Sequence, residues 1–414
     1  MINKIKLLGV FTILIIIFSS SAASINLKSI DANTENNKII NPNFISADVY
    51  VDDDADPSWY DETHVKTIQE GVDNATEYEN IFVYNGTYFE HVVIYKPVNL
   101  TGENKDSTII DGQFVGSVVK IISDGVSIQN FNLINSGYSE FSSGIRVISN
   151  YTTVKNNKFN ENSDALLIFP GLNSDYILHD NIVENNLFIN NHGSILLFDT
   201  NNNSVFNNEI NNIDYLLGYG GIYLLLSDNN SIFNNSISNL SYSGAFGIGL
   251  AHSKKNIISN NEIENIDEEG IICFKSHLNM FYNNEISKVN KYGIYIEESE
   301  FNEFCHNNIN SCYNGIHIIR FSNNNKFCYN NIKNITKKAI YIEDSNFNKI
   351  RYNNIINCII KATFLRSSFN CWCKNYWGRF RFLPKPIFGR KGKLFSLIPW
   401  VNYDFFPAKT PNEI

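Results

Sequence analysis

One short phrase recurs along the chain between residues 154 and 355. It reads apolar residue, two variable residues, Asn, one more residue, then Ile or Phe, and nine copies fit it. Successive Asn are 29, 22, 27 and 26 residues apart, and then 23 residues apart four times in succession. A fixed period in the low twenties, carried by strand-forming residues, predicts a solenoid in which each repeat is one coil. The repeated asparagines are Asn157, Asn186, Asn208, Asn235, Asn261, Asn284, Asn307, Asn330 and Asn353.

A second phrase lies between these copies: a small residue, Ile or Leu, any residue, and an aliphatic residue, as in Gly293–Ile296. Apolar residues two apart are the period of a strand with one buried face, so we expect about three short strands and three corners per coil. The pattern has no long amphipathic helix between strands, which argues against a βαβ sheet or TIM barrel. It predicts an all-β fold, a single-stranded parallel β-helix of about twelve coils.

The repeated asparagines have a structural interpretation. Stacked coils are ~4.8 Å apart, so residues at equivalent positions form a column through the solenoid. Each amide in such a column donates to the carbonyl of the next, and a buried polar row then satisfies its own hydrogen bonds. We therefore predict an inward asparagine column that sets coil register and has no catalytic role. Phe131 stands at the Asn position of an earlier copy.

The segments outside the repeat differ in composition. Residues 1–24 read as a secretory signal, with Lys4 and Lys6 before an apolar run too short for a typical membrane span, and residues 25–47 read as a polar linker. Residues 48–370 are the predicted β-helix, whose first coil is covered by a short helix that starts at the capping box Thr67–Glu70. Residues 371–414 are rich in aromatic residues and proline and predict an irregular C-terminal cap. We expect a secreted or cell-surface protein, in contact with a membrane only if the signal stays uncleaved as an anchor.

Several stretches resemble those of known exported β-helices. At the entry they are Tyr50–Pro57, Thr67–Glu70, Val83–Tyr88, Leu100–Glu103 and Ile110–Gly112. At the end they are Asn375–Gly378, Ile398–Trp400 and Asp404–Pro407. Together, over about residues 50–410, they resemble right-handed parallel β-helix proteins of the pectin-lyase-like superfamily, including NosD-type and carbohydrate-binding/sugar-hydrolase repeat families. The resemblance implies the fold, a right-handed coil and export. It does not fix an activity, because that fold carries lyases, hydrolases, epimerases, adhesins and spacers.

The outward residue of the second phrase defines a column whose later half is aromatic. Flat rings at ~4.8 Å steps could stack sugar faces, or the aromatic tail could fold back and bury them as a packing surface. We expect burial of the members nearest the tail and an open Tyr223. The column is Arg146, Leu167, Leu196, Tyr223, Gly249, Ile272, Tyr295, His317, Tyr341 and Phe364, and its candidate ligand-binding members are Tyr223, Tyr295, His317, Tyr341 and Phe364.

Charged residues form a further column: His252, Lys275, Glu298, Arg320 and Asp344. Solvated pairs between neighbouring coils are one interpretation, each worth ~0–1 kcal/mol. A polysaccharide lyase would instead need carboxylates beside a basic residue, and a hydrolase two carboxylates ~5–9.5 Å apart. The cluster with that composition is Glu297, Glu298, Arg320, Glu343 and Asp344.

Two metal hypotheses arise from the sequence. Asp52, Asp54 and Asp56 alternate and offer the oxygen ligands that calcium prefers, although the chain lacks an EF-hand glycine and terminal glutamate there. A NosD-like role in copper-site maturation would need thiol or thioether ligands. Of seven cysteines, Cys305 and Cys328 hold the same place in adjacent coils, so their Cα atoms should be ~5 Å apart, within disulfide range, while Cys273 should face the core.

These patterns favour a non-enzymatic surface protein that binds polysaccharide or other cell-envelope components. A polysaccharide lyase, hydrolase or epimerase is the first alternative, and the NosD-like accessory role is the second. The net charge of −9 gives no basic footprint for nucleic acid. The binding hypothesis requires no cofactor and leaves calcium as an optional ligand.

Overall fold

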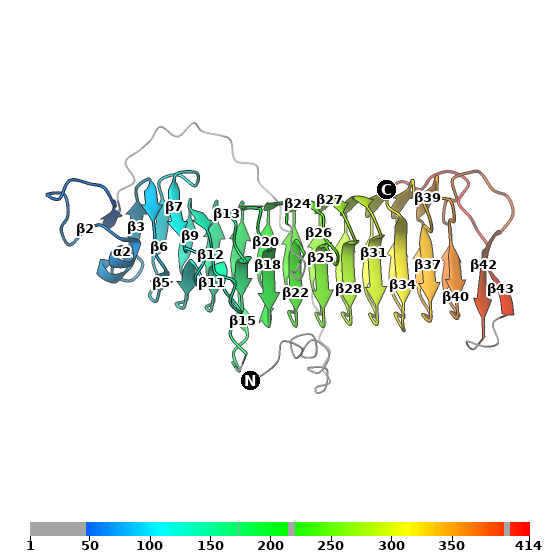
Figure 1. Cartoon of the computed structure of the whole chain (residues 1–414). Helices are drawn as coiled ribbons and strands as arrows, with labels where there is room; N and C mark the ends of the chain where they lie inside the picture. Colours follow the sequence, from blue (N-terminus) through cyan, green and yellow to red (C-terminus); the bar gives the residue numbers. More distant parts are fainter. Residues whose placement is uncertain (1–46, 173, 214–219, 393–397) are drawn as a thin grey trace. The chain divides into compact units, whose positions relative to one another are not determined.

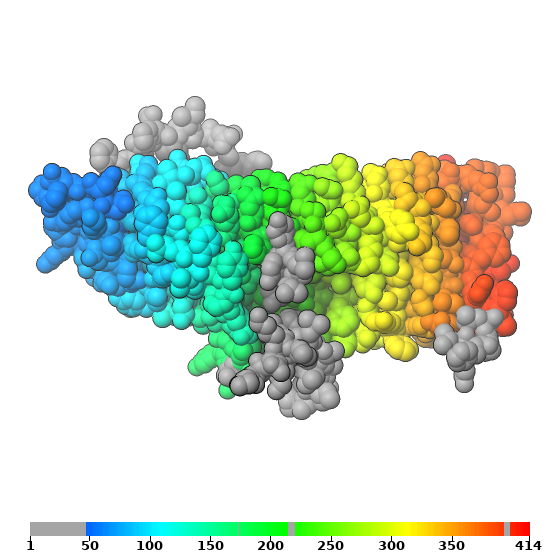
Figure 2. Space-filling model, in the orientation of Figure 1, coloured from blue at the N-terminus to red at the C-terminus, as the bar shows by residue number. Residues whose placement is uncertain are grey.

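A computed structural model describes residues 47–172, 174–213, 220–392 and 398–414. They belong to one compact unit, Ser46–Ile414. The proposed signal segment, residues 1–24, and all of the linker except residue 47 lie outside the described residues. Among the described residues, no helix has the length and apolar character needed to cross a membrane. Coil follows coil in sequence order through this unit (Figures 1 and 2).

The predicted solenoid is confirmed, with about 13 turns where the sequence indicated about twelve. A complete coil contributes one strand to each of three sheets, whose strands pair in parallel except for β42 with β43. Sheet 1 contains β5 (Val92–Ile94), β8 (Val119–Ile121), β11 (Ser143–Val147), β14 (Asp164–Ile168), β18 (Gly193–Phe198), β22 (Ile222–Leu225), β25 (Phe246–Ala251), β28 (Glu269–Phe274), β31 (Tyr292–Glu297), β34 (Asn314–Ile319), β37 (Ile340–Glu343), β40 (Thr363–Leu365) and β42 (Lys385–Lys391).

Among the described strands, sheet 2 joins sheet 1 at the C-terminal end, where β42 and β43 pair antiparallel. Its strands are β1 (Val49–Val51), β2 (His64–Val65), β3 (Asn80–Val83), β6 (Asn99–Gly102), β9 (Ser127–Gln129), β12 (Thr153–Lys155), β16 (Ile182–Glu184), β20 (Ser204–Phe206), β23 (Ser231–Phe233), β26 (Ile257–Ser259), β29 (Met280–Tyr282), β32 (Glu303–Cys305), β35 (Lys326–Cys328), β38 (Lys349–Arg351), β41 (Cys371–Cys373) and β43 (Ile398–Asp404).

Sheet 3 has twelve strands. They are β4 (Gly86–Tyr88), β7 (Thr108–Asp111), β10 (Asn132–Ile134), β13 (Lys158–Asn160), β17 (Leu187–Ile189), β21 (Glu209–Asn211), β24 (Ser236–Leu240), β27 (Glu262–Ile266), β30 (Glu285–Val289), β33 (Asn308–Asn310), β36 (Asn331–Lys333) and β39 (Asn354–Ile356). A separate pair, β15 (Leu178–His179) and β19 (Thr200–Asn201), lies beside the main stack.

The corners of the coils depend on left-handed backbone. The coil from β28 to β30 turns at Lys275, Leu278, Asn283 and Lys288, whose φ angles are 46°, 61°, 56° and 52°. Only one of these four positions is an asparagine, the residue that adopts this conformation most readily after glycine; the others carry long side chains. Left-handed backbone in such residues costs roughly 1–3 kcal/mol each, which the stacked neighbours must offset. In this coil, contacts with the stacked neighbours therefore hold corners that local preference alone would not favour.

The asparagine column is buried and continuous, as predicted. Each side chain from Asn157 to Asn353 is at most 2% exposed. The Nδ2 of Asn284 donates to the Oδ1 of Asn307 at 2.9 Å and to the carbonyl of Ile258 in the preceding coil at 2.9 Å. The same pattern repeats from Asn186 onward, and at the start the N–H of Phe131 donates to the Oδ1 of Asn157 at 3.0 Å. The column thus satisfies itself and fixes the register of successive coils.

The structure contains a second buried asparagine column that the sequence analysis missed. The Nδ2 of Asn279 donates to the Oδ1 of Asn302 at 3.1 Å, and that of Asn302 to the Oδ1 of Asn325 at 3.1 Å. Each member precedes a member of the first column by five residues, so the signal was present in the sequence. The bonded run is Asn181, Asn203, Asn230, Asn256, Asn279, Asn302, Asn325, Asn348 and Asn370.

The N-terminal capping helix is confirmed as α2 (Ile68–Asn74). Thr67 and Glu70 form the reciprocal capping box, and a second carboxylate, Glu90, accepts the N–H groups of Ile68 and Gln69 at 2.9 and 3.0 Å. A Cβ on Gly71 would lie 2.8 Å from the Val51 side chain, so glycine allows the helix to approach β1 closely. The helix therefore covers the apolar end of the first coils.

The C-terminal cap extends the stack instead of folding back along it. Strand β42 pairs in parallel with β40, and β43 pairs antiparallel with β42 and meets β41 at Trp372 and Asp404. Asp404 is fully buried and accepts hydrogen bonds from the N–H and Nδ2 of Asn375, at 3.0 and 3.1 Å, and from Trp377 Nε1 at 3.1 Å. Because Asn375 continues the first asparagine column, one carboxylate terminates that column and anchors the cap.

The cysteines agree with their predicted places. Cys305 and Cys328 form a disulfide between β32 and β35, with Cα atoms 4.7 Å apart. Cys273 is fully buried in the core. The other described cysteines are unpaired, and Cys371 Sγ lies 3.2 Å from Nη2 of Arg351.

Candidate functional site

The predicted outward column lies on the outer face of sheet 1. Strand register aligns its members coil by coil, with Tyr295 beside His317 and His317 beside Tyr341. The prediction for Phe364 is wrong by one residue, because Tyr341 pairs with Thr363 while Phe364 pairs with the inward Ile342. Phe364 is 2% exposed and belongs to the core.

The N-terminal half of this column is a packing surface. Leu167 and Leu196 are buried although they lie outside the coil core, and they form a second apolar cluster with Phe169, Leu225 and Ala251. Tyr223 packs against that cluster, 5.4 Å from the Phe246 ring, and burial raises its pKa to about 12. The expectation of an open Tyr223 is therefore wrong, and this half offers no aromatic platform.

The C-terminal half carries four rings that are partly exposed. The Tyr295 and His317 ring centres are 5.7 Å apart, and those of His317 and Tyr341 are 4.8 Å apart. Tyr292, which the sequence analysis did not select, lies 4.5 Å from His317 and 5.1 Å from Tyr295. The sequence could have indicated this ring, because Tyr292 directly precedes Gly293, the small residue that opens the second phrase. Lys338 Nζ lies 3.7 Å from the centre of the Tyr341 ring, so the rings form one continuous group with a cation at one end.

The predicted charged cluster divides into separate ion pairs beside these rings. Glu297 accepts a hydrogen bond from the Tyr295 hydroxyl at 2.7 Å and pairs with Arg320. Two coils further on, Glu343 accepts from the Tyr341 hydroxyl at 3.0 Å and pairs with a second arginine, Arg366, at 2.5 Å.

The remaining two carboxylates of the predicted cluster are also paired. Asp344 receives two bonds from Arg366, at 2.7 and 2.6 Å, and Glu298 lies 3.6 Å from Lys275. Arg366 was missed, although it follows Asp344 by 22 residues, close to one coil period. The unit of Tyr, Glu and Arg thus occurs twice, two coils apart, and each of these carboxylates has a cationic partner.

The site is poorly solvated, and the pKa values reflect this. Burial, followed by the bonds to Glu297 and Glu343, raises the pKa values of Tyr295 and Tyr341. Burial and then the charges of Lys338 and Lys337 lower the pKa of His317 to about 4. The Nδ1 of His317 is buried and has no hydrogen-bond partner among the described residues. The imidazole is therefore neutral at pH 7.

This shift predicts a pH dependence. The folded imidazole titrates near 4 and its usual pKa is 6.5, so between these values the unfolded chain binds more protons. Stability from His317 is therefore present above pH 6.5 and is lost as the pH falls toward 4. We expect His317→Gln to show a shallower fall in the free energy of unfolding over this window, measured by urea denaturation at several pH values. If the free energy of unfolding fell equally steeply with falling pH in the wild type and in His317→Gln, the burial of the imidazole would be contradicted.

The N-terminal acidic loop brings together a different trio from the one predicted. Carboxylate oxygens of Asp52, Asp53 and Asp54 lie within 4.8 Å of one another. Asp56 instead accepts hydrogen bonds from the N–H and hydroxyl of Ser58, at 2.9 and 2.5 Å. Burial raises the pKa of Asp52, and the neighbouring carboxylates of Asp54 and Asp53 raise it further. Such mutual repulsion is what a bound cation would relieve, so the loop suits calcium chemically.

The described thiols do not gather into a copper site. Cys305 and Cys328 are bonded to each other, with the Glu303 carboxylate within 4.8 Å of their sulfur atoms. Cys273, Cys312 and Cys358 are buried in separate coils. Among the described residues, the clusters with metal-ligating spacing are that disulfide group and the Asp52–Asp54 trio.

The geometry defines a parallel β-helix with a partly buried aromatic and ionic strip on one outer face. Residues 211–356 match the family model described as "Right handed beta helix region". The match and the parallel coils confirm the fold that the sequence resemblance implied, a right-handed β-helix. The match does not identify a NosD-type subfamily.

Solved structures with a similar fold are distant in sequence. The catalytic domain of a GH87 alpha-1,3-glucanase in complex with nigerose has 14% identity and a TM-score of 0.49, over 74% of this chain and 67% of that one. The periplasmic alginate epimerase AlgG has 11% identity and a TM-score of 0.42, over 70% and 73%. The DFA-IIIase of Arthrobacter chlorophenolicus has 11% identity and a TM-score of 0.46, over 73% and 84%. No curated protein sequence matches the chain. At this distance the likenesses say nothing about the activity of this chain.

Proposed function

We propose that this chain is an exported β-helix protein that binds glycans, without chemical turnover, on the outer face of sheet 1 between β31 and β40. The observation that carries the proposal is the group of four partly exposed rings, Tyr292, Tyr295, His317 and Tyr341, bordered by two Tyr–Glu–Arg units. Rings offer apolar faces to sugar C–H surfaces, and the flanking ions offer hydrogen bonds to hydroxyl groups.

The pairing of the carboxylates favours binding over hydrolysis. A glycosidase needs one carboxyl group that holds a proton near neutral pH and a second one across the scissile bond. Glu297 and Glu343 are each bonded to an arginine and to a tyrosine hydroxyl, so neither carboxylate is free to act across a scissile bond. They also lie two coils apart, ~10 Å along the stack. A lyase or epimerase remains the alternative, because the unpartnered Nδ1 of the neutral His317 could accept a proton.

The first test is binding. A glycan array identifies a polysaccharide, and calorimetry then measures its affinity for the wild type, Tyr295→Ala and Tyr341→Ala. Each lost ring should weaken affinity about fivefold, since a stacked ring contributes about 1 kcal/mol. Tyr295→Phe keeps the ring and should keep most of the affinity.

Two controls make the result specific. Tyr313→Ala removes an exposed ring outside the strip and should leave affinity unchanged. Melting temperatures identify variants that lose binding only because they unfold. Equal losses of glycan affinity in Tyr313→Ala and Tyr295→Ala would exclude the strip as the binding face. New reducing ends or unsaturated products after incubation with the bound glycan would show that the enzymatic alternative is correct.

Calcium at the Asp52–Asp54 loop is a separate prediction. We expect Ca²⁺ to raise the melting temperature of the wild type, because it neutralises the three clustered carboxylates, and to have no such effect on Asp54→Asn. Thermal unfolding with added calcium and with chelator measures both. The glycan site requires no cofactor under this proposal.

A further inference from the structure

The C-terminal cap concentrates positive charge on a protein that is acidic overall. Residues 371–414 contain eight Lys or Arg and two acidic residues, whereas the whole chain has a net charge of −9. One of the two acidic residues, Asp404, is fully buried and bound to N–H donors of Asn375 and Trp377. The other, Glu413, is exposed and forms no ion pair with the described cations. The cap therefore cannot neutralise its own cations.

Cations in the coils pair with carboxylates, whereas Lys374, Lys385 and Lys409 of the cap lie over aromatic rings, those of Tyr352, Trp377 and Phe382. Arg320, Lys326 and Arg366 each pair with a carboxylate one coil earlier. Among the described residues, no ion pair involves the cap cations Lys374, Arg379, Arg381, Lys385 and Lys409.

The cap cations also repel one another. Burial lowers the pKa of Lys385, and the charges of Arg381, Lys361 and Arg379 lower it further. Such a cluster is unfavourable unless an anion joins it.

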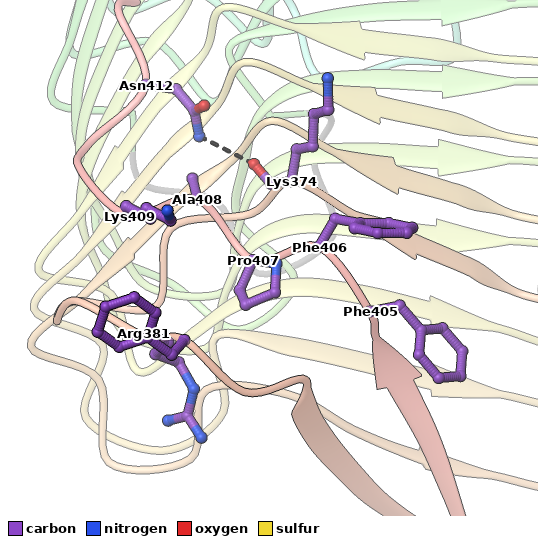
Figure 3. Close-up of a pocket in the computed structure, with 9 residues that line it drawn as sticks. Lys374, Arg381, Phe405, Phe406, Pro407, Ala408, Lys409 and Asn412 are labelled. Carbon is purple, nitrogen blue, oxygen red and sulfur yellow. Dashed lines mark hydrogen bonds between the residues drawn. The ribbon is translucent and has the colours of Figure 1, made fainter.

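Three of these cations line one pocket, together with three exposed rings. The pocket has a volume of about 370 Å³ and is lined by Lys374, Arg381, Lys409, Phe382, Phe405 and Phe406. Arg381 and Lys409 lie on one side of Pro407 and the rings of Phe405 and Phe406 on the other (Figure 3). The rings are 80%, 63% and 71% exposed for Phe382, Phe405 and Phe406. The Nε of Arg381 is buried without a hydrogen-bond partner among the described residues.

We propose that this pocket binds an acidic glycan, a polysaccharide whose sugars carry carboxylates. Guanidinium and ammonium groups pair with the carboxylates, and the phenylalanine rings stack on the sugar faces beside them. An anionic membrane would be attracted by the same charges, but the site is a pocket, and cations, rings and Asn412 all line it. That arrangement fits a chain of separate polar sugars better than a flat lipid surface. The site is distinct from the strip on sheet 1, and it does not depend on the function proposed there.

The test uses the full-length protein and two matched polymers, polygalacturonate and its carboxyl-reduced neutral form. We expect the wild type to bind the acidic polymer, more weakly as salt rises, and not the neutral one. Arg381→Ala/Lys409→Ala should weaken this binding about five- to tenfold, because each screened charge contact contributes up to about 1 kcal/mol. Phe405→Ala/Phe406→Ala should also weaken it and should change its salt dependence little. Lys374 is left intact because its φ of 53° makes substitution there ambiguous.

Controls separate this site from general charge and from the strip on sheet 1. Lys66→Ala/Lys254→Ala removes the same charge from exposed positions elsewhere and should bind as the wild type. Tyr295→Ala should also bind the acidic polymer normally, so failure of either proposal is visible without the other. Absence of binding to polygalacturonate, equal binding to the neutral polymer, or equal loss in the Lys66/Lys254 control would each overturn the proposal. So would tight binding to phosphatidylglycerol vesicles that competes with the polymer and is lost in Arg381→Ala/Lys409→Ala.

Discussion

Asn307→Leu is expected to lower the free energy of unfolding by roughly 4 kcal/mol or more, since a buried group left unsatisfied costs about 1–3 kcal/mol. Asn307 accepts from the N–H and Nδ2 of Asn284, at 3.0 and 2.9 Å, and donates to Phe281 O and Asn330 Oδ1, both at 3.0 Å. Leucine satisfies none of these groups. Urea denaturation followed by circular dichroism measures the change.

The adjacent residue supplies a matched control. Asn308 follows Asn307 as the first residue of β33, and its side chain is partly exposed and donates to Glu285 at 3.2 Å. Asn308→Leu makes the same chemical change on the solvent side, and we expect an effect within about 0.5–1 kcal/mol. Similar losses in both variants would mean that leucine disturbs β33 itself, and the column would then not be the source of the stability.

Asp404→Ala is expected to detach the C-terminal cap from the last coil. The carboxylate accepts four hydrogen bonds, from Lys374 N–H, Asn375 N–H, Asn375 Nδ2 and Trp377 Nε1, at 3.0 to 3.2 Å. Removing it leaves buried donors unpaired, at roughly 1–3 kcal/mol each, so the local loss should exceed about 4 kcal/mol. Amide hydrogen exchange should accelerate in β42 and β41.

The loss should stay local, because each coil contacts only its neighbours. Exchange in β28 to β30, several coils away, should not change. Glu413→Ala, which removes an exposed acid from the same segment, should leave both regions protected. Asp404→Asn should give exchange rates between those of the wild type and Asp404→Ala, since its one carbonyl oxygen can accept only some of the hydrogen bonds that the carboxylate accepts. Uniform loss of protection along the chain after Asp404→Ala would show that the β-helix unfolds as one unit.

The neighbours in the aromatic strip on sheet 1 were partly predictable from the sequence, because a fixed period places residues in columns. Tyr295, His317 and Tyr341 were predicted to be neighbours, and strand pairing confirms it. Phe364 was misplaced because an aromatic residue suits both faces of β40, and the pairing of Tyr341 with Thr363 decides which face it takes. Coil spacing predicted that charged residues of neighbouring coils would pair, but it did not predict which residue pairs with which. Arg320 pairs with Glu297 and not with its column neighbour Glu298, which lies 3.6 Å from Lys275 instead.

The sequence alone determined the solenoid, its inward asparagine column, the helix that covers its start and the adjacency of Cys305 and Cys328. These features repeat or are local, so residue spacing encodes them directly. Tertiary structure alone decided that Tyr223 is packed against Phe246 and that the C-terminal hairpin continues the stack on Asp404. It also decided that Arg381, Lys409 and the phenylalanines around them share one pocket. Those contacts join segments that follow no period, and only the folded positions of both partners bring them together.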